Sequence, residues 1–129
     1  MAGCWEKDMK PTAFDVVREF MNAWEACDLD RLLAVVDDEI IFVGTTGPEP
    51  GRTYSGKEAF RKAVTPLLSP ALTICFRPRE MFNAGETIIA TWETIDSANQ
   101  LSHSRMIGID IFRVSNGKVI LKDAYRKSY

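Results

Sequence analysis

The sequence has few of the residues that build metal centres and disulfide frameworks. It contains three cysteines, Cys4, Cys27 and Cys75, with no Cys-x-x-Cys pair, and a single histidine, His103. An odd number of unpaired cysteines favours neither a disulfide framework nor a zinc site. No phosphate-cradling glycine-rich loop is present either. We therefore predict no cofactor and no metal, and we expect Cys27 and Cys75 to be small apolar core residues.

Long apolar runs and a strong excess of one charge are also missing. Sixteen Lys and Arg stand against eighteen Asp and Glu, for a net charge of −2. This balance gives no field that would attract nucleic acid or an anionic membrane. No apolar run approaches the roughly 18 residues of a membrane span, and the N-terminus lacks the apolar core of a signal peptide. We expect a cytoplasmic protein that binds neither nucleic acid nor membrane.

The apolar content is sufficient for one compact domain. The chain has 129 residues, of which 46% are hydrophobic. A chain of this length can bury one continuous core but leaves no room for a second domain of ordinary size. We expect a flexible N-terminal tail over residues 1–10 and a single α+β domain over residues 11–129.

The first part of the chain has the pattern of helices. Thr12 followed by Asp15 resembles a capping box, and apolar residues then recur at helical spacing over residues 13–27. Asp28 can cap a second, shorter helix. That helix should end at the acidic cluster 37–39, because acidic side chains at a helix C-terminus oppose the helix dipole.

A glycine- and proline-rich segment separates this part from a third helix. Residues 40–43 are apolar and predict a short buried strand, and residues 44–54 then form the longest predicted loop. A loop of this length often covers a site, so it is either a lid or pocket rim or a plain connector. Ser55 and Glu58 resemble a second capping box, and Pro66 should kink or end the helix that follows.

The second half of the chain has the period of strands. Asn116-Gly117 separates two runs of β-branched and aromatic residues, which strongly predicts a hairpin with a tight turn. Helices followed by a strand meander predict an α+β fold with the helices on one face of the sheet. The four expected strands cover residues 71–82, 86–96, 101–114 and 118–126.

One carboxylate stands out in the hairpin. Asp110 lies between Ile109 and Ile111, and strand alternation places it on the same face as Gly108 and Phe112. That face has the composition of a buried surface. Asp110 is therefore the leading candidate for a functional residue, while His103 falls on the opposite face and is expected to be a solvated strand-end residue rather than a catalytic one.

The order of elements and three motifs resemble the SnoaL-like families of the nuclear-transport-factor-like superfamily. The motifs are Asp-Leu-Asp-Arg-Leu-Leu, Tyr-Ser-Gly-Lys-Glu and Gly-Ile-Asp-Ile-Phe-Arg-Val-Ser-Asn-Gly-Lys-Val. The superfamily includes ketosteroid isomerase, scytalone dehydratase and limonene epoxide hydrolase. The resemblance implies a cone-shaped α+β barrel in which a curved antiparallel or mixed sheet wraps around three N-terminal helices. It also implies a deep apolar pocket and a homodimer formed through the convex face of the sheet.

The same resemblance assigns a role to Asp110. It looks like the carboxylic acid that ketosteroid isomerases use to stabilise an enolate oxygen, and an apolar cavity suits such a group. However, Gly44 stands where those enzymes keep the general base, and Phe20 where they keep the tyrosine of the oxyanion hole. Steroid isomerisation by that mechanism is therefore not expected. The Asp-Arg-Asp arrangement of limonene epoxide hydrolase cannot be placed without shifting a strand.

The strand over residues 86–96 is expected to supply one wall of the pocket. Its inward residues should be Ile88, Ala90, Trp92 and Thr94, which leaves Glu93 outside to pair with Arg105. Trp92 is either a wall for a flat ligand or ordinary core, and the same alternatives hold for Trp24 and Phe20. The predicted substrate-binding set is Phe20, Trp24, Tyr54, Ile88, Trp92, Met106 and Phe112.

The register of the last strand decides which group accompanies Asp110. A strict two-residue turn sets Asp123 opposite Asp110 and turns Tyr125 inward. A bulge instead turns Lys122 and Arg126 inward, and a nearby cation would keep Asp110 ionised as a base. Our catalytic assignment is Asp110 assisted by Tyr125.

Two functions from different classes are consistent with these residues. The first is a cofactor-independent cyclase, isomerase or lyase that acts on a small apolar carbonyl-containing metabolite, with Asp110 as general acid or base. The second is a non-catalytic ligand-binding or assembly domain, in which Asp110 is a structural acid. Dimerisation is expected under both, because Ile107, Ile109 and Ile111 form an apolar row on the outer face.

Overall fold

The computed structural model describes residues 10–69, 74–96 and 106–128. The helices are α1 (Ala13–Glu25), α2 (Leu29–Leu33) and α3 (Lys57–Val64), which continues into a short 3-10 helix, η1 (Thr65–Leu68). The strands are β1 (Val36–Val43), β2 (Thr53–Ser55), β3 (Ile74–Ala84), β4 (Thr87–Asp96), β5 (Met106–Ser115) and β6 (Lys118–Ser128).

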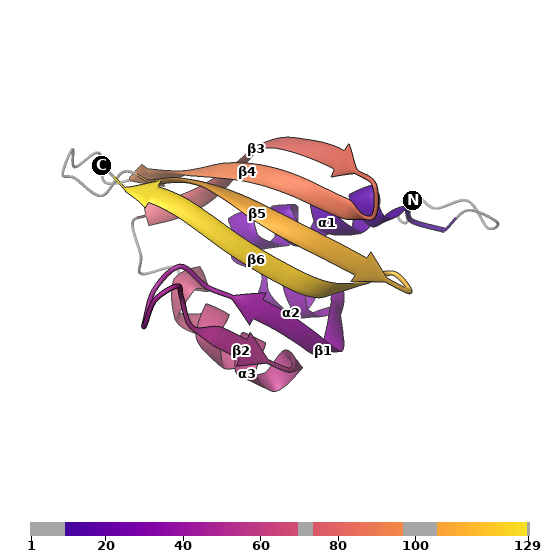
Figure 1. The fold of residues 1–129 in the computed structure, drawn as a ribbon, viewed down its shortest axis with the longest axis horizontal. Helices are drawn as coiled ribbons and strands as arrows, with labels where there is room; N and C mark the ends of the chain where they lie inside the picture. Colours follow the sequence, from indigo (N-terminus) through magenta and orange to yellow (C-terminus); the bar gives the residue numbers. More distant parts are fainter. Residues whose placement is uncertain (1–9, 70–73, 97–105, 129) are drawn as a thin grey trace.

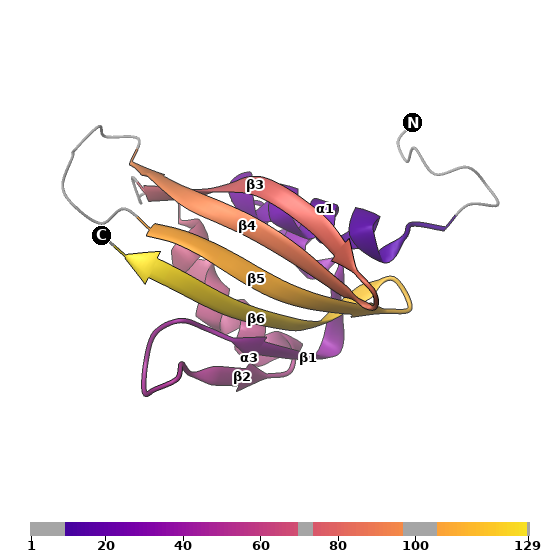
Figure 2. The same ribbon diagram turned by 45° about the horizontal axis from the view of Figure 1, so that its top comes forward.

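The strands form one mixed sheet in the order β2-β1-β6-β5-β4-β3. The pair β1 and β6 is parallel, and the other neighbouring strands are antiparallel. The helices lie on one face of the sheet, with α1 behind β3 and β4 and α3 behind β1 and β2 (Figures 1 and 2). The predicted α+β cone is confirmed, although the sheet remains open between its edge strands β2 and β3.

Helix α1 begins where the sequence predicted. The Thr12 backbone N–H donates to Asp15 Oδ2 at 3.0 Å, and the Asp15 backbone N–H donates to Thr12 Oγ1 at 3.0 Å. Two of the otherwise unpaired donors of the first turn are thereby satisfied. The buried face of the helix consists of Val16, Val17, Phe20, Met21 and Ala23.

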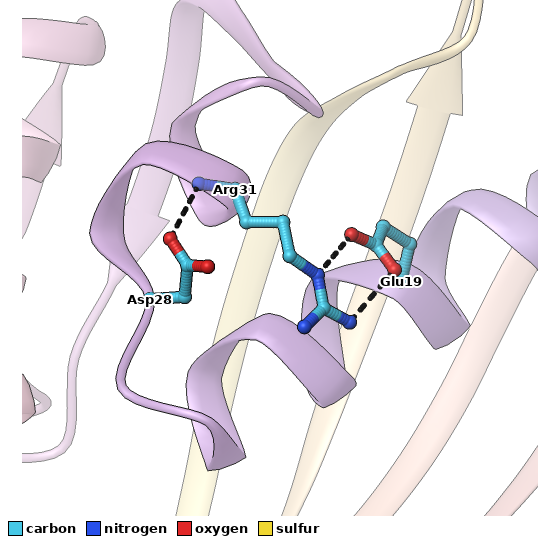
Figure 3. A network of polar contacts seen from close by, with 3 residues as sticks. All are labelled: Glu19, Asp28 and Arg31. Carbon is cyan, nitrogen blue, oxygen red and sulfur yellow. Dashed lines mark hydrogen bonds and ion pairs between the residues drawn. The ribbon is translucent and has the colours of Figure 1, made fainter. Parts of the chain in front are cut away.

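Helix α2 is joined to α1 by polar contacts. Asp28 accepts a hydrogen bond from the Arg31 backbone N–H at 3.1 Å, and this confirms the predicted cap. The Arg31 guanidinium donates to both carboxylate oxygens of Glu19 on α1, at 2.6 and 3.1 Å (Figure 3). The helix is shorter than expected because the chain already pairs with β6 at Val36, so the acidic cluster 37–39 lies within β1.

The predicted capping box of the third helix is wrong. The N-cap of α3 is Gly56, with φ of 94°, and no side chain caps the helix. Ser55 instead ends β2, where it pairs with Ile41. Pro66 acts as predicted, because the α-helix ends at Val64 and only the 3-10 turn continues.

The C-terminal hairpin contains a tight turn followed by a bulge. Asn116 and Gly117 have φ values of 50° and 76°, as the Asn-Gly pair predicted. Val114 pairs with Val119, whereas Arg113 pairs with Leu121, so Ile120 is an extra residue on β6. The bulge shifts the register of the rest of β6 by one residue. Of the two predicted registers, the structure therefore has the one that turns Lys122 and Arg126 inward.

The core fills the space between the helices and the inner face of the sheet. The β4 residues predicted to face inward, Ile88, Ala90, Trp92 and Thr94, are all buried. The outward Glu93 pairs with Arg77 of β3 at 3.0 Å, while its predicted pair Arg105 lies outside the described residues.

The prediction that Cys27 and Cys75 are core residues is wrong, because both are exposed. Cys27 follows the end of α1 with φ of 56°, beyond the buried stripe. Cys75 alternates with the inward residues of β3. In the described part of the chain, no helix has the length and apolarity needed to cross a membrane.

Candidate functional site

Small residues leave room at the centre of the inner sheet face. Asp110 on β5 lies opposite Ala90 of β4 and Ala124 of β6. The next inward residue along β5 is Gly108, which lies opposite Trp92 and Arg126. Because side chains on one sheet face fill the space above it, three small residues around Asp110 create a hollow there.

Asp110 is buried in this hollow and held by two donors. The residue is 2% exposed. Its Oδ1 accepts a hydrogen bond from Trp92 Nε1 at 3.1 Å, and its Oδ2 lies 3.3 Å from Lys122 Nζ. Both donors come from neighbouring strands, at positions diagonal to Asp110 across the sheet.

Lys122 is a buried cation that lies between aromatic rings. The residue is 5% exposed, and its Nζ lies 4.9 Å from the ring centroids of both Trp24 and Phe42. The faces of these rings carry partial negative charge, so they favour an ammonium group at that distance. Asp110 supplies the opposite charge at 3.3 Å.

The bulge at Ile120 brings this pair together. It sets Lys122 opposite Phe112 on the inner face, as the bulged alternative predicted. Tyr125 consequently lies on the outer face, where it is 55% exposed. The prediction that Tyr125 assists Asp110 is therefore wrong. Its hydroxyl donates to Asp123 Oδ2 at 3.0 Å, and this hydrogen bond raises the pKa of Tyr125 above its usual value.

Trp92 reaches Asp110 because its opposite residue has no side chain. A Cβ at Gly108 would lie 2.1 Å from Trp92 Cζ2, which no real contact allows. The indole therefore lies across the β5 backbone, and this places Nε1 beside the carboxylate. This role of Gly108 was not predicted, although a glycine two residues before a buried acid on the same strand face was the available signal.

Two adjoining cavities meet at the ion pair. The smaller, of about 40 Å³, is bordered by Asp110 and Lys122, and the larger, of about 250 Å³, is bordered by Lys122. Four residues border both cavities: Trp24, Phe76, Trp92 and Lys122. The ammonium therefore borders both cavities, whereas the carboxylate borders only the smaller one.

The long loop borders the larger cavity. Gly44, Thr45 and Thr46 from the loop line it, together with Tyr54 of β2. Tyr54 stacks on Phe42, with ring centroids 5.5 Å apart, and the Gly44 N–H donates to the Arg52 carbonyl at 2.9 Å. These contacts support the rim alternative for this loop over a plain connector.

The predicted substrate-binding residues divide into two groups. Trp24, Tyr54, Trp92 and Met106 line the larger cavity. The remaining three, Phe20, Ile88 and Phe112, are core residues with at most 1% exposure and line neither cavity. Phe20 lies on α1 itself, and its ring centroid is 5.0 Å from that of Phe112 on β5. These inward side chains therefore fill the core between helix and sheet instead of bordering a cavity.

One polar atom near the cavities has no partner in the described part of the chain. Trp24 Nε1 is buried and has no hydrogen-bond acceptor among the described residues. Such a donor costs about 1–3 kcal/mol when it stays unpaired.

Within residues 10–69, 74–96 and 106–128, no group of three His, Cys, Asp or Glu could hold a metal ion. His103 lies outside these residues.

Solved structures of low sequence identity share this fold, an open cone with a hollow between the helices and the sheet. An NTF2-like protein of unknown function from Mesorhizobium loti is 19% identical, with a TM-score of 0.73 over 87% of this chain and 88% of that chain. A candidate ketosteroid isomerase from Kribbella flavida is 9% identical, with a TM-score of 0.69 over 90% of this chain and 78% of that one. A candidate polyketide cyclase from Pseudomonas putida is 19% identical, with a TM-score of 0.67 over 88% and 90% of the two chains.

The sequence itself gives the family. The model of the SnoaL-like domain matches residues 17–121, which span the fold from α1 to β6. The chain belongs to the SnoaL-like family. No curated protein matches it in sequence.

Proposed function

We propose that this protein is a cofactor-independent enzyme that acts on a small, apolar, carbonyl-containing metabolite. The observation that carries the proposal is the buried Asp110–Lys122 pair at the junction of two cavities. A base and a cation 3.3 Å apart in apolar surroundings are the two groups that enolisation of a carbonyl compound needs. Among the described residues each of its oxygens accepts only one donor, so the carboxylate has further lone pairs to offer.

The proposed reaction begins with the carbonyl group in the hollow. The carbonyl oxygen lies against the Lys122 ammonium, and the Asp110 carboxylate takes a proton from the adjacent carbon. The electron pair of the broken C–H bond moves into the new carbon–carbon double bond, and the carbonyl π pair moves to oxygen. The enolate charge then develops beside the ammonium, where a fixed cation stabilises it strongly in a low dielectric.

The fate of the enolate sets the type of reaction. Return of the proton from Asp110 to another carbon gives an isomerisation, and attack of the enolate on a second carbonyl of the same molecule gives a cyclisation. Loss of a leaving group from the next carbon gives a lyase reaction. The neighbours from Kribbella flavida and Pseudomonas putida, described as a candidate isomerase and a candidate cyclase, support the first two.

The test is exchange of solvent deuterium into the C–H bonds next to the carbonyl group in a panel of small ketones that includes keto acids, followed by proton NMR. We expect the protein to accelerate exchange for at least one ketone, and Asp110→Asn to lose about a hundredfold or more of that rate. Lys122→Met should lose rate as well. The control is Tyr125→Phe, which removes a hydroxyl from the outer face and should leave the rate unchanged. Exchange no faster than in buffer for every ketone would exclude the proposal.

A second function is favoured by one specific observation. Both oxygens of Asp110 already have donors, from Trp92 and Lys122, as in a purely structural ion pair. Under this alternative the domain binds a small ligand without turnover, or serves only assembly. Asp110→Asn would then lower stability and leave the fate of any bound ketone unaffected.

We also propose that the protein is a homodimer formed through the outer face of the sheet. Ile107, Ile109 and Ile111 run along this face, and Ile109 is 45% exposed. A hollow on the same face is bordered by Ile107, Ile109 and Tyr125. An apolar row on an exposed sheet face is typical of an interface with another protein surface.

A further inference from the structure

The larger cavity has an unusual balance of charge among the described residues that border it. Two of its lining residues are cationic, Lys122 and Arg126, and none is Asp or Glu. The one carboxylate of the hollow, Asp110, borders the smaller cavity instead. A ligand in the larger cavity therefore meets positive charge without a competing acid on the wall.

The two cations differ in what neutralises them. The ammonium of Lys122 is compensated by Asp110 at 3.3 Å. Among the described residues, no carboxylate pairs with Arg126, whose Nη1 lies 2.8 Å from Met106 Sδ. A thioether is a weak acceptor, so most of the hydrogen-bonding capacity of the guanidinium remains available. A planar fork of donors of this kind matches a carboxylate in two-point geometry.

The spacing of Arg126 and Lys122 along β6 limits the length of a ligand that contacts both. Lys122, Ala124 and Arg126 lie on one face of the strand, so the two cations are four positions apart, about 13 Å between Cα atoms. Ala124 lies between them and also borders the larger cavity, whose lining includes five aromatic side chains. Arg126 is exposed at the end of the strand and also borders the outer hollow, which suits the mouth of a site.

We infer that the larger cavity binds a ligand that carries a carboxylate on a flat apolar body, with the carboxylate on Arg126 and the opposite end at Lys122. This inference deepens the proposed function, on which it rests for the position of the reacting carbonyl at Lys122. The substrate class is accordingly an aromatic or cyclic keto acid and not a neutral ketone.

The experiment compares two probes of nearly equal shape by isothermal titration calorimetry. The probes are para-acetylbenzoate and its neutral amide, para-acetylbenzamide. We expect the wild-type protein to bind the acid about tenfold or more tightly than the amide, because one charge-assisted pair is lost with the amide. Arg126→Gln should abolish this preference. The control is Arg113→Gln, which removes the same charge from an exposed position on β5 that borders neither cavity and should keep the preference.

Equal affinity for the two probes, a preference that survives Arg126→Gln, or no binding of the acid would each overturn the inference. Its failure is distinct from failure of the proposed function, because this titration needs no turnover. Preference for the acid without any deuterium exchange would remove the enzymatic proposal alone. Exchange into ketones without preference for the acid would remove the carboxylate site alone.

Discussion

The side chains of Asp110 and Lys122 each carry a charge into surroundings that otherwise contain aromatic rings and small residues. Removing two charges from water is costly, and their mutual attraction offsets that cost only when geometry and further hydrogen bonds are favourable. Here Trp92 Nε1 supplies a hydrogen bond to Asp110, and two rings surround the ammonium. These contacts offset part of the cost of burying the two charges. We attribute the presence of the pair to the proposed enzymatic function.

Removing one member of the pair should be more harmful than removing both charges. Lys122→Met leaves the Asp110 carboxylate unpaired, and we expect a loss of about 3–5 kcal/mol in the free energy of unfolding. The double variant Asp110→Asn, Lys122→Met should recover part of that loss. Urea unfolding of the two single variants and the double variant measures the coupling. Strictly additive losses would show that the two groups do not interact.

Gly108 should be sensitive to the smallest possible side chain. In Gly108→Ala the added methyl group meets Trp92 Cζ2, so the indole must move and its hydrogen bond to Asp110 is lost. We expect a loss of about 1–3 kcal/mol, typical of overpacking. In a Trp92→Leu background the same substitution should cost clearly less, because the conflicting ring is gone. Equal costs in the two backgrounds would contradict this account of Trp92.

Local elements were the most predictable part of the chain. The Thr12 capping box, the Asp28 cap and the Asn116-Gly117 turn each depend on a few adjacent residues, and all three are present. Ser55 failed as a cap because β2 pairs with β1 there, and this long-range contact is not encoded locally. The bulge at Ile120 was foreseen as one of two registers, since alternation alone does not fix which residue is unpaired.

The capping box of α1 should contribute to the free energy of unfolding in a way that depends on pH. Thr12→Ala should cost about 1 kcal/mol at neutral pH, while Thr12→Ser should cost little because it keeps the hydroxyl. The backbone hydrogen bond from Thr12 lowers the pKa of Asp15 below its ordinary value of 3.8. A depressed carboxyl pKa gives stability that is complete above the unfolded value and is lost as the pH falls through the folded value.

The pH dependence is measured by comparing Asp15→Asn with the wild type in denaturant unfolding. Asp15→Asn should be less stable at neutral pH, and the difference should shrink below pH 3.8. A difference that stays constant across this range would show that the Asp15 charge does not contribute to the cap.

The fold as a whole followed from the family pattern, whereas the extent of the hollow did not. Phe20, Ile88 and Phe112 face inward as expected but are packed into the core, while Trp24, Tyr54 and Met106 line the cavity. Strand parity gives the face of a residue and not the element that covers it. Whether an inward residue lies in the core or borders the cavity depends on how far α1 extends over the sheet and on where Gly108 and Ala124 leave space. Neither follows from the sequence of one strand alone.

The proposed homodimer is tested by measuring the molar mass in solution. We expect the wild-type protein to be a dimer in light scattering and Ile109→Glu to be a monomer, because a charge in the middle of the apolar row would be buried unpaired at the interface. The circular dichroism spectrum of the variant should match that of the wild type. A wild-type monomer over the micromolar range would contradict the proposed interface.

The proposed function depends most on Asp110 acting as the base. The decisive measurement is the rate of deuterium incorporation by Asp110→Asn, compared with the wild type at a temperature where thermal unfolding shows both to be fully folded. We predict a fall of about a hundredfold or more in that rate, with the retained fold as the internal control. An Asp110→Asn protein that remains folded and exchanges the ketone at the wild-type rate would contradict the central claim.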